Sequence, residues 1–233
     1  MPPTLVLIRH AQAEHNLTRD YNIRDPGLTE RGRTQCVDLR NALQKDPIVQ
    51  QADLIITSPM RRTIQTALDT VDWLIEKGVK IEADASWQEN SDKPCDTGRD
   101  IKAVAAEFPD IDYSTVDPLW PDKRSTAASQ YHYTKKAVLR RGQTALERLY
   151  SRPEKVIVVV SHSYFLRAGV AGTWFFNADY RIFDMEQTGN SYQVVQHAWT
   201  KKKGGGLGLS RTEPVMLGAD LPEELEENGV TDL

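Results

Sequence analysis

The chain has 233 residues, of which 39% are hydrophobic and 27% charged, and its formal net charge at pH 7 is -4. This length suits one α/β domain with a sizeable core, and the slight negative charge disfavours nucleic acid or an anionic membrane as a partner. No run of residues approaches the ~20 apolar positions that span a bilayer. The start, Met1-Pro2-Pro3, lacks a secretory signal pattern, and the distant Cys36 and Cys95 fit free thiols in a reducing compartment. We therefore expect a cytoplasmic domain, and the sequence leaves its oligomeric state open.

Short apolar runs, rich in β-branched residues, are typical of strands buried in an α/β sheet. They lie at residues 4–8, 53–57, 79–81 and 155–160. Residues 181–187 and 192–199, on either side of a Thr-Gly-Asn-Ser turn, predict an antiparallel hairpin. The pattern indicates a three-layer α/β/α sandwich with a mostly parallel, mixed central sheet flanked by helices.

Helix signals alternate with these strands. Thr29 is the N-cap candidate of a helix whose apolar stripe includes Val37, Leu39 and Leu43. Ser58-Pro59 predicts a cap and first helical position for a second helix that runs to about residue 76. A third, amphipathic helix is expected over residues 134–150. Its inward-facing residues are Val138, Ala145, Leu146 and Leu149.

Polar residues occur where the apolar strands end. Arg9 and His10 follow the first strand, Arg62 lies in the segment after the second, and His162 follows the strand at 155–160. Because the carboxyl ends of the strands form the ligand-binding edge of open α/β sheets, we expect these side chains to converge. Clustered cations repel one another and lose hydration, so the arrangement suits an anion between them. Arginine matches phosphate oxygens with a planar fork and a neutral imidazole attacks phosphorus, so phosphate is the expected anion.

Four motifs carry a family resemblance. They are Leu7-Ile8-Arg9-His10-Ala11 with Glu14 and Asn16, Leu28-Thr29-Glu30-Arg31-Gly32, Thr57-Ser58-Pro59-Met60-Arg61-Arg62-Thr63, and Val159-Val160-Ser161-His162-Ser163. In this order they resemble the histidine phosphatase superfamily, in the branch related to phosphoglycerate mutases, and the chain is similar to fungal members. The His-Asp pair of the acid phosphatase and phytase branch is missing, since Ser163 follows His162.

The resemblance implies a phosphate-binding nucleophilic site. His10 would be the phosphorylated nucleophile, and Arg9, Arg62 and a protonated His162 would surround the phosphoryl oxygens. Asn16 and Ser163 are further expected substrate contacts.

Glu89 falls where this branch places its proton donor. It would protonate the leaving alcohol and then activate water, so its pKa should be raised by burial.

The resemblance implies no cofactor and no metal, and a small phosphorylated substrate as the partner. The catalytic domain would span residues 1–200, with an excursion at 89–133 over the active site, and residues 201–233 would form a C-terminal extension or tail.

Some of these assignments have competitors nearby. Arg61 competes with Arg62 as the phosphate ligand, although alignment on Ser58-Pro59 favours Arg62. The carboxylates that compete with Glu89 are Glu82, Asp84 and Asp92. Ala11 and Ser163-Tyr164 replace glycines common in the family, which makes Tyr164 a candidate to narrow the pocket.

Three functions are compatible with these residues. The first is a phosphomonoesterase that hydrolyses a small phosphorylated substrate through phosphohistidine, the second a phosphoglycerate mutase, and the third a non-catalytic binding or scaffold protein. The presence of His10, Arg62 and His162 favours catalysis. Acidic residues outnumber basic ones in the excursion, which is unfavourable for holding a bisphosphorylated intermediate, so hydrolysis is preferred.

Overall fold

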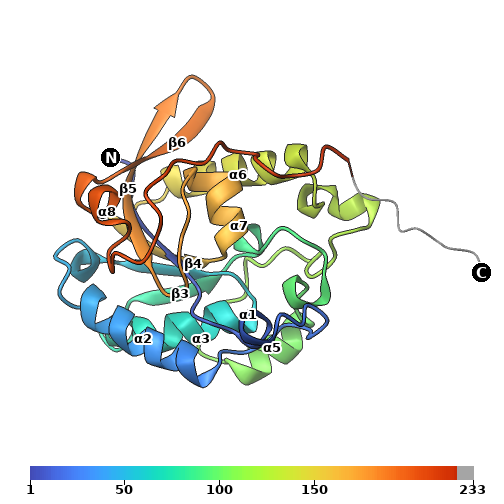
Figure 1. Ribbon diagram of the computed structural model, residues 1–233, viewed down its shortest axis with the longest axis horizontal. Helices are drawn as coiled ribbons and strands as arrows, with labels where there is room; N and C mark the ends of the chain where they lie inside the picture. Colours follow the sequence, from blue (N-terminus) through green and yellow to red (C-terminus); the bar gives the residue numbers. More distant parts are fainter. Residues whose placement is uncertain (225–233) are drawn as a thin grey trace, which may run out of the picture.

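The structure is a computed structural model that describes residues 1–224 of the chain. Its strands form one six-stranded sheet in the order β3-β2-β4-β1-β5-β6 (Figure 1). They are β1 (Thr4–Arg9), β2 (Leu54–Thr57), β3 (Lys80–Ala83), β4 (Val156–Ser161), β5 (Tyr180–Thr188) and β6 (Ser191–Gln196). The β1–β4, β2–β4 and β2–β3 pairs are parallel, whereas β5 pairs antiparallel with both β1 and β6.

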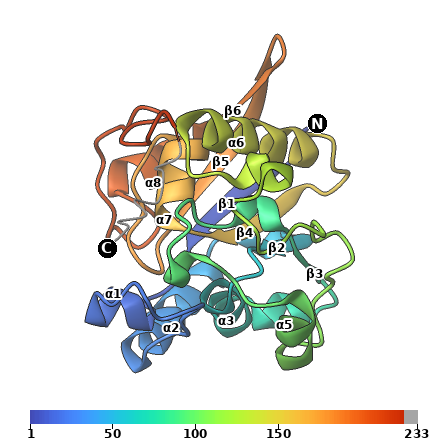
Figure 2. The ribbon, with the colours of Figure 1, turned by 90° about the vertical axis from the view of Figure 1, so that its right-hand side faces the viewer.

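Helices cover both faces of this sheet, with α2 and α3 on one side and α6 and α7 on the other (Figure 2). The helices are α1 (Glu14–Thr18), α2 (Glu30–Leu43), α3 (Arg61–Thr70), α4 (Asp72–Ile75), α5 (Ile101–Glu107), α6 (Lys135–Tyr150), α7 (Ser163–Phe165) and α8 (Ala198–Lys203). A π-helical turn, Leu166–Ala171, extends α7, and short 3-10 helices lie at Val49–Gln51, Ala85–Trp87, Pro94–Asp96 and Thr126–Tyr131. The expected three-layer α/β/α sandwich with a mostly parallel mixed sheet is confirmed.

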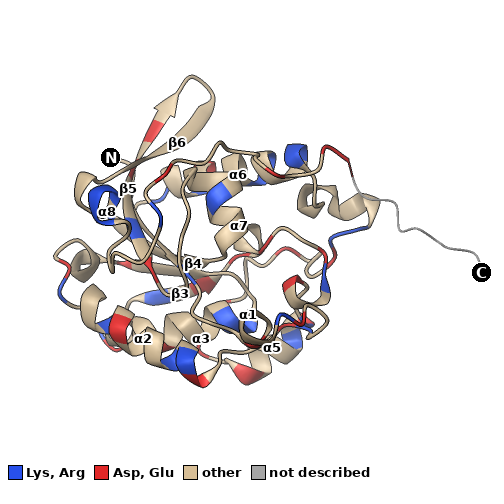
Figure 3. Cartoon of the chain, in the orientation of Figure 1, with Lys and Arg blue, Asp and Glu red and all other residues tan. Residues whose placement is uncertain are grey.

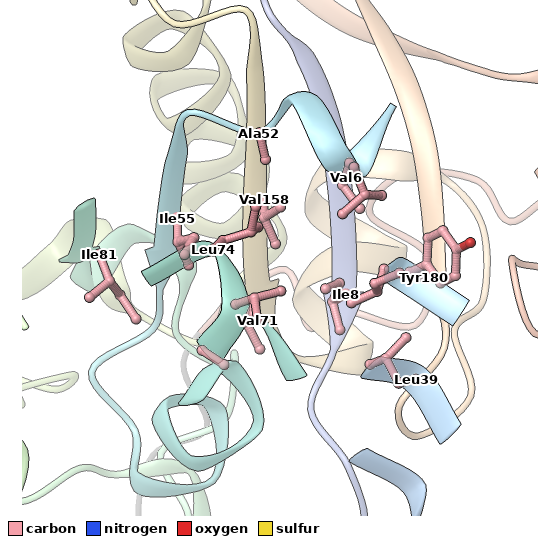
Figure 4. Packing of buried hydrophobic residues seen from close by; sticks show 14 of the residues in the cluster. Val6, Ile8, Leu39, Ala52, Ile55, Val71, Leu74, Ile81, Val158 and Tyr180 are labelled. Atoms are coloured by element: carbon pink, nitrogen blue, oxygen red, sulfur yellow. The ribbon is translucent and has the colours of Figure 1, made fainter. Parts of the chain in front are cut away.

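The central strands β1, β2 and β4 are apolar over most of their length because both of their faces are buried. In β1, Val6 and Ile8 belong to the core cluster under α2 and α3, whereas Leu5 and Leu7 belong to the cluster under α6 and α7. Figure 4 shows the first of these clusters, in which Val6 and Ile8 lie among residues from the sheet and the covering helices. Side chains alternate between the two faces of a strand, so a strand covered on both sides needs apolar residues at every position.

Helix α2 begins as its sequence indicates, since the Thr29 side chain accepts a hydrogen bond from the Gly32 amide (3.0 Å). The expected burial of Val37 is wrong, because its side chain is 56% exposed. The helix turns Cys36, Leu39 and Leu43 into the core, and Val37 lies ~100° around the axis from Cys36.

Helix α3 begins at Arg61 rather than at Pro59, and Met60 is its extended N-cap residue. The Ser58 hydroxyl does not cap the helix, because it lies 3.0 Å from Nε2 of His162. Instead, Asp25 accepts a hydrogen bond from the Arg61 amide (2.9 Å). The predicted single helix to about residue 76 is broken at Val71, where φ is -124° and ψ 21°.

The hairpin ends earlier than expected, since β6 stops at Gln196 and Trp199 lies in α8.

Past α8, the chain wraps around Asp179, whose carboxylate accepts hydrogen bonds from the Leu207 amide and the Ser210 hydroxyl. Gly205 passes so close to this carboxylate that an added Cβ would lie 2.1 Å from Oδ2. The C-terminal extension therefore packs on the domain at least this far, and the end of the expected acidic tail, residues 225–233, lies outside the described residues. Within residues 1–224, no helix is both long enough and apolar enough to cross a membrane.

Candidate active site

The carboxyl ends of β1 and β4 bring His10 and His162 together, as the sequence predicts. The two strands pair in parallel with Arg9 opposite Ser161, so the histidine after each strand lies at the same edge. Their ring centroids are 5.2 Å apart. Arg62, from the first turn of α3, contacts both rings: Nε donates to Nε2 of His10 (3.2 Å), and Nη2 lies 3.0 Å from Nδ1 of His162. All three side chains are buried.

The environment of His10 favours a neutral imidazole with a nucleophilic Nε2. Its Nδ1 lies 2.7 Å from the Ala11 carbonyl oxygen, so Nδ1 carries the proton, and the lone pair of Nε2 accepts the hydrogen bond from Nε of Arg62. Burial, followed by the positive charges of Arg62 and Arg9, lowers the pKa of His10 well below 6.5. In the neutral imidazole Nε2 is unprotonated, and this is the form of the side chain that can attack phosphorus.

His162 is held in the complementary tautomer. Its Nδ1 accepts from Arg62, so Nε2 carries the proton and donates to the Ser58 hydroxyl. Burial, and then Arg62, lowers the pKa of His162 well below 6.5. These surroundings favour a neutral ring, in contrast to the expected imidazolium. A phosphoryl dianion beside Nδ1 would shift the balance back toward the protonated ring.

The structure also brings Asp96 to Arg62, which sequence reasoning missed. Nη2 of Arg62 lies 2.9 Å from Oδ1 of Asp96, and Nη1 donates to the Cys95 carbonyl (2.6 Å). The other oxygen of Asp96 accepts from the Ser91 hydroxyl (2.6 Å). A carboxylate thus uses part of the guanidinium fork that a phosphate group would need.

Glu89 is buried, and its carboxylate faces the start of α7. Oε1 accepts from the amides of Asn90 and Phe165 (both 2.9 Å), and Oε2 accepts from the Tyr164 amide (3.1 Å). Burial, followed by the negative charge of Asp96, raises the pKa of Glu89, and the amide hydrogen bonds oppose this rise. The raised pKa agrees with what the sequence led us to expect of a proton donor.

The carboxylates that compete with Glu89 in the sequence are engaged elsewhere. Glu82 pairs with Arg152, Asp84 caps the 3-10 helix through the Ser86 amide, and Asp92 pairs with Arg124. Among the four, Glu89 is the carboxylate with contacts to α7, the helix that directly follows His162.

Arg61 and Arg62 are clearly separated by their surroundings. The side chain of Arg61 is 40% exposed and pairs with Glu107 through Nε (2.9 Å), whereas that of Arg62 is 1% exposed. The structure therefore brings Arg62 into the site, and Arg61 forms a surface ion pair.

Arg9 and Asn16 lie at the margin of the site. Nη1 of Arg9 donates to the Phe175 carbonyl (2.9 Å), and its buried Nε has no hydrogen-bond partner among the described residues. Burial lowers the pKa of Arg9 to about 10, so the side chain stays charged at neutral pH. Asn16 does not bond His10 directly; Asn177, 3.4 Å from Asn16, donates to the His10 carbonyl (3.1 Å). Ser163 begins α7 beside His162, and its contact with substrate stays a prediction.

A third histidine, His15, also lies next to the nucleophile. Its ring centroid is 6.1 Å from that of His10, and its Nε2 lies 3.0 Å from Nδ2 of the Asn16 side chain. Burial, followed by the charge of Arg62, lowers the pKa of His15 to about 3. Its position between Glu14 and Asn16 in the first motif was the available sequence signal.

Lys123 fixes the segment that carries Glu89 and Asp96. Its buried Nζ donates to the backbone carbonyls of Glu89 (2.7 Å), Ser91 (2.8 Å) and Asp96 (2.6 Å). In the sequence, Lys123 is only one of several basic residues of the excursion, without a local signal of this role. Within the described chain, no group of three or more His, Cys, Asp or Glu residues is arranged to bind a metal ion.

Comparison with known proteins identifies the family of the chain. Residues 5–199 match the family model of the histidine phosphatase superfamily (branch 1). A probable phosphatase of Schizosaccharomyces pombe is 28% identical over 169 residues, covering 70% of this chain and 76% of that protein. A phosphoglycerate mutase-like protein of Arabidopsis thaliana is 30% identical over 204 residues, covering 70% and 72%.

Solved structures share the fold. The ecdysone phosphate phosphatase of Bombix mori, in complex with tungstate, aligns with a TM-score of 0.54 at 14% identity, over 83% of this chain and 92% of that one. The match of the family model over residues 5–199 shows that the chain belongs to branch 1 of the histidine phosphatase superfamily.

Proposed function

We propose that this protein is a phosphomonoesterase that hydrolyses a small phosphate monoester through a phosphohistidine at His10. The observation that carries the proposal is the buried contact of Arg62 with both His10 and His162. It combines a neutral nucleophile, a fixed cation and a second imidazole at one point. The family and the phosphatase among the relatives support phosphatase activity in general.

In the first step, the phosphoryl oxygens accept the donors of Arg62, which releases the lone pair of Nε2 of His10 from its hydrogen bond to Arg62. Nε2 then attacks phosphorus, and the bond between phosphorus and the ester oxygen breaks. Arg62, together with Arg9 and a His162 that is protonated in the presence of the phosphoryl dianion, stabilises the negative charge on the phosphoryl oxygens. Protonated Glu89 gives its proton to the leaving alcohol, and its raised pKa favours this form.

In the second step, water attacks phosphorus and the phosphorus–nitrogen bond breaks. Glu89, now a carboxylate, accepts the proton of the attacking water, so both the acid and the neutral imidazole are regenerated. The products are inorganic phosphate and the alcohol. No metal or cofactor is required in this scheme.

A phosphoglycerate mutase uses the same nucleophile but returns the phosphoryl group to its product. Asp96 places a negative charge directly at Arg62, and this charge disfavours retention of a bisphosphorylated intermediate. The proposal therefore favours hydrolysis over transfer back to the product.

The decisive experiment measures phosphate release from a panel of phosphate monoesters, beside a coupled assay for 2-phosphoglycerate formation from 3-phosphoglycerate. We expect release of phosphate without dependence on 2,3-bisphosphoglycerate. His10→Ala should abolish release and the acid-labile phosphoenzyme while the circular dichroism spectrum stays unchanged. Efficient 2-phosphoglycerate formation with negligible phosphate release would overturn the phosphatase assignment, and turnover by a folded His10→Ala variant would overturn the nucleophile.

A further inference from the structure

A cavity outside the candidate active site lies on the α6 side of the sheet. Its volume is about 560 Å³, and it is lined by α6, by the segment from Ser129 to Thr134 and by Ser86. None of its lining residues belongs to the site around His10, Arg62 and His162. The cavity has the size of a site for a small molecule, for which ~300–1,000 Å³ is usual.

Positive charge dominates the lining of this cavity. The basic residues that line it are Lys136, Arg140, Arg141 and Arg148. Three of them, with Thr144, are spaced by four residues and share one face of α6, where Figure 3 shows basic positions. None of the lining residues, all of which lie in the described part of the chain, is acidic. Asp84, outside the lining, lies 4.0 Å from Nη1 of Arg148.

Exposed basic residues on a helix are usually no more than a solvated face, but Arg141 is different. Its side chain is only 4% exposed, and it lies over the Phe165 ring, with the guanidinium carbon 4.2 Å from the ring centroid. Nη2 donates to Oδ1 of Asn90 (2.5 Å), whereas Nε and Nη1 have no hydrogen-bond partner within residues 1–224. These two nitrogens have almost no accessible surface, so they do not themselves donate into the cavity. Because no carboxylate of the described residues forms an ion pair with Arg141, its buried charge adds to the positive potential of the cavity and would stabilise an anion there.

We propose that this cavity is a binding site for a small polyanion that carries phosphate groups, separate from the reaction site. The guanidinium groups supply planar forks that match phosphate oxygens, and the hydroxyls of Ser86 and Thr144 supply additional donors. Arg141 connects the cavity to the reaction site through Asn90, the residue next to Glu89. A ligand there contacts the same arginine that holds the Glu89 segment.

The probe for this site is methylenediphosphonate, whose phosphorus–carbon bonds resist hydrolysis. It is titrated into the full chain by isothermal titration calorimetry. We expect Arg140→Glu and Arg148→Glu each to weaken binding at this site at least about tenfold. Arg31→Glu is the matched control, because Arg31 is an exposed helical arginine on α2, on the opposite face of the sheet. Melting temperatures of all variants check that they are folded.

Arg62→Ala separates the two sites. If the probe binds both, this variant should lose the reaction site and keep the site that Arg140→Glu removes. The proposal is overturned if all binding is lost in Arg62→Ala and unchanged in Arg140→Glu, if Arg31→Glu weakens binding as much as Arg140→Glu, or if the folded wild-type chain does not bind the probe. Because binding is read without turnover, these outcomes are independent of whether the reaction proposed above is correct.

Discussion

Arg62 and Asp96 form an ion pair within the candidate active site, with Nη2 2.9 Å from Oδ1. The same guanidinium contacts His10 and His162, so the carboxylate of Asp96 lies where phosphoryl oxygens are expected to bind. Asp96 has a second partner in the Ser91 hydroxyl, 2.6 Å away. We infer that Asp96 and phosphate compete for Arg62.

Asp96→Asn should therefore strengthen phosphate binding. Removing one negative charge beside the bound anion lowers the inhibition constant for inorganic phosphate by about tenfold. The measurement is product inhibition of phosphate release. Asp92→Asn is the control, since its carboxylate lies on the same segment but pairs with Arg124. Weaker phosphate binding in Asp96→Asn would show that Asp96 supports the site instead of competing for it.

Arg62→Ala and Arg61→Ala should have very different effects on kcat/KM. Loss of the buried guanidinium removes the donors to the phosphoryl oxygens, so kcat/KM should fall by at least about 10²-fold. Arg61 forms a partly exposed ion pair with Glu107, which contributes at most about 1 kcal/mol, so Arg61→Ala should stay within about threefold of wild type. Steady-state kinetics on both variants show which of the two arginines is needed for the reaction. Equal losses would mean that the two neighbours share the role assigned to Arg62.

The pH profile should reveal Glu89 through its alkaline limb. The donor must be protonated, so kcat/KM falls as pH rises through the raised pKa of Glu89. On the acid side, activity should persist below pH 6.5, because the pKa of His10 is lowered well below that value and its ring stays neutral. Glu89→Gln should reduce the rate by about 10²–10⁴-fold and remove the alkaline limb. A limb that survives in Glu89→Gln would assign it to another group.

Lys123→Met should destabilise the segment that carries both carboxylates. Three backbone carbonyls lose their donor, so the free energy of unfolding should decrease by about 2–4 kcal/mol. Urea denaturation measures this change, and the exposed Lys102 of α5 provides the matched control Lys102→Met. We also expect a lower kcat in Lys123→Met under conditions in which the variant is fully folded. Unchanged stability would show that solvent replaces the lysine.

The sequence by itself determined the layers of the fold and the centre of the site. The apolar runs of β1 and β4 identify strands buried on both faces, because alternating side chains enter two separate cores. The polar residues after these strands predict which edge of the sheet carries the candidate active site, since parallel strands end together. The local sequence pattern was a weaker guide to burial where two adjacent apolar residues could each face the core. In α2, Cys36 is buried and its neighbour Val37 is exposed.

Only the tertiary structure decided which distant groups meet at that edge. Asp96 and Lys123 lie in an irregular segment without hydrophobic periodicity, so nothing local indicates that one reaches Arg62 and the other is buried under Glu89. The same holds for Ser58, which has the sequence of a helix cap but binds His162, the residue that follows the neighbouring strand β4. Such contacts depend on the packing of the whole chain, because buried polar groups take the partners that the fold brings within hydrogen-bond distance.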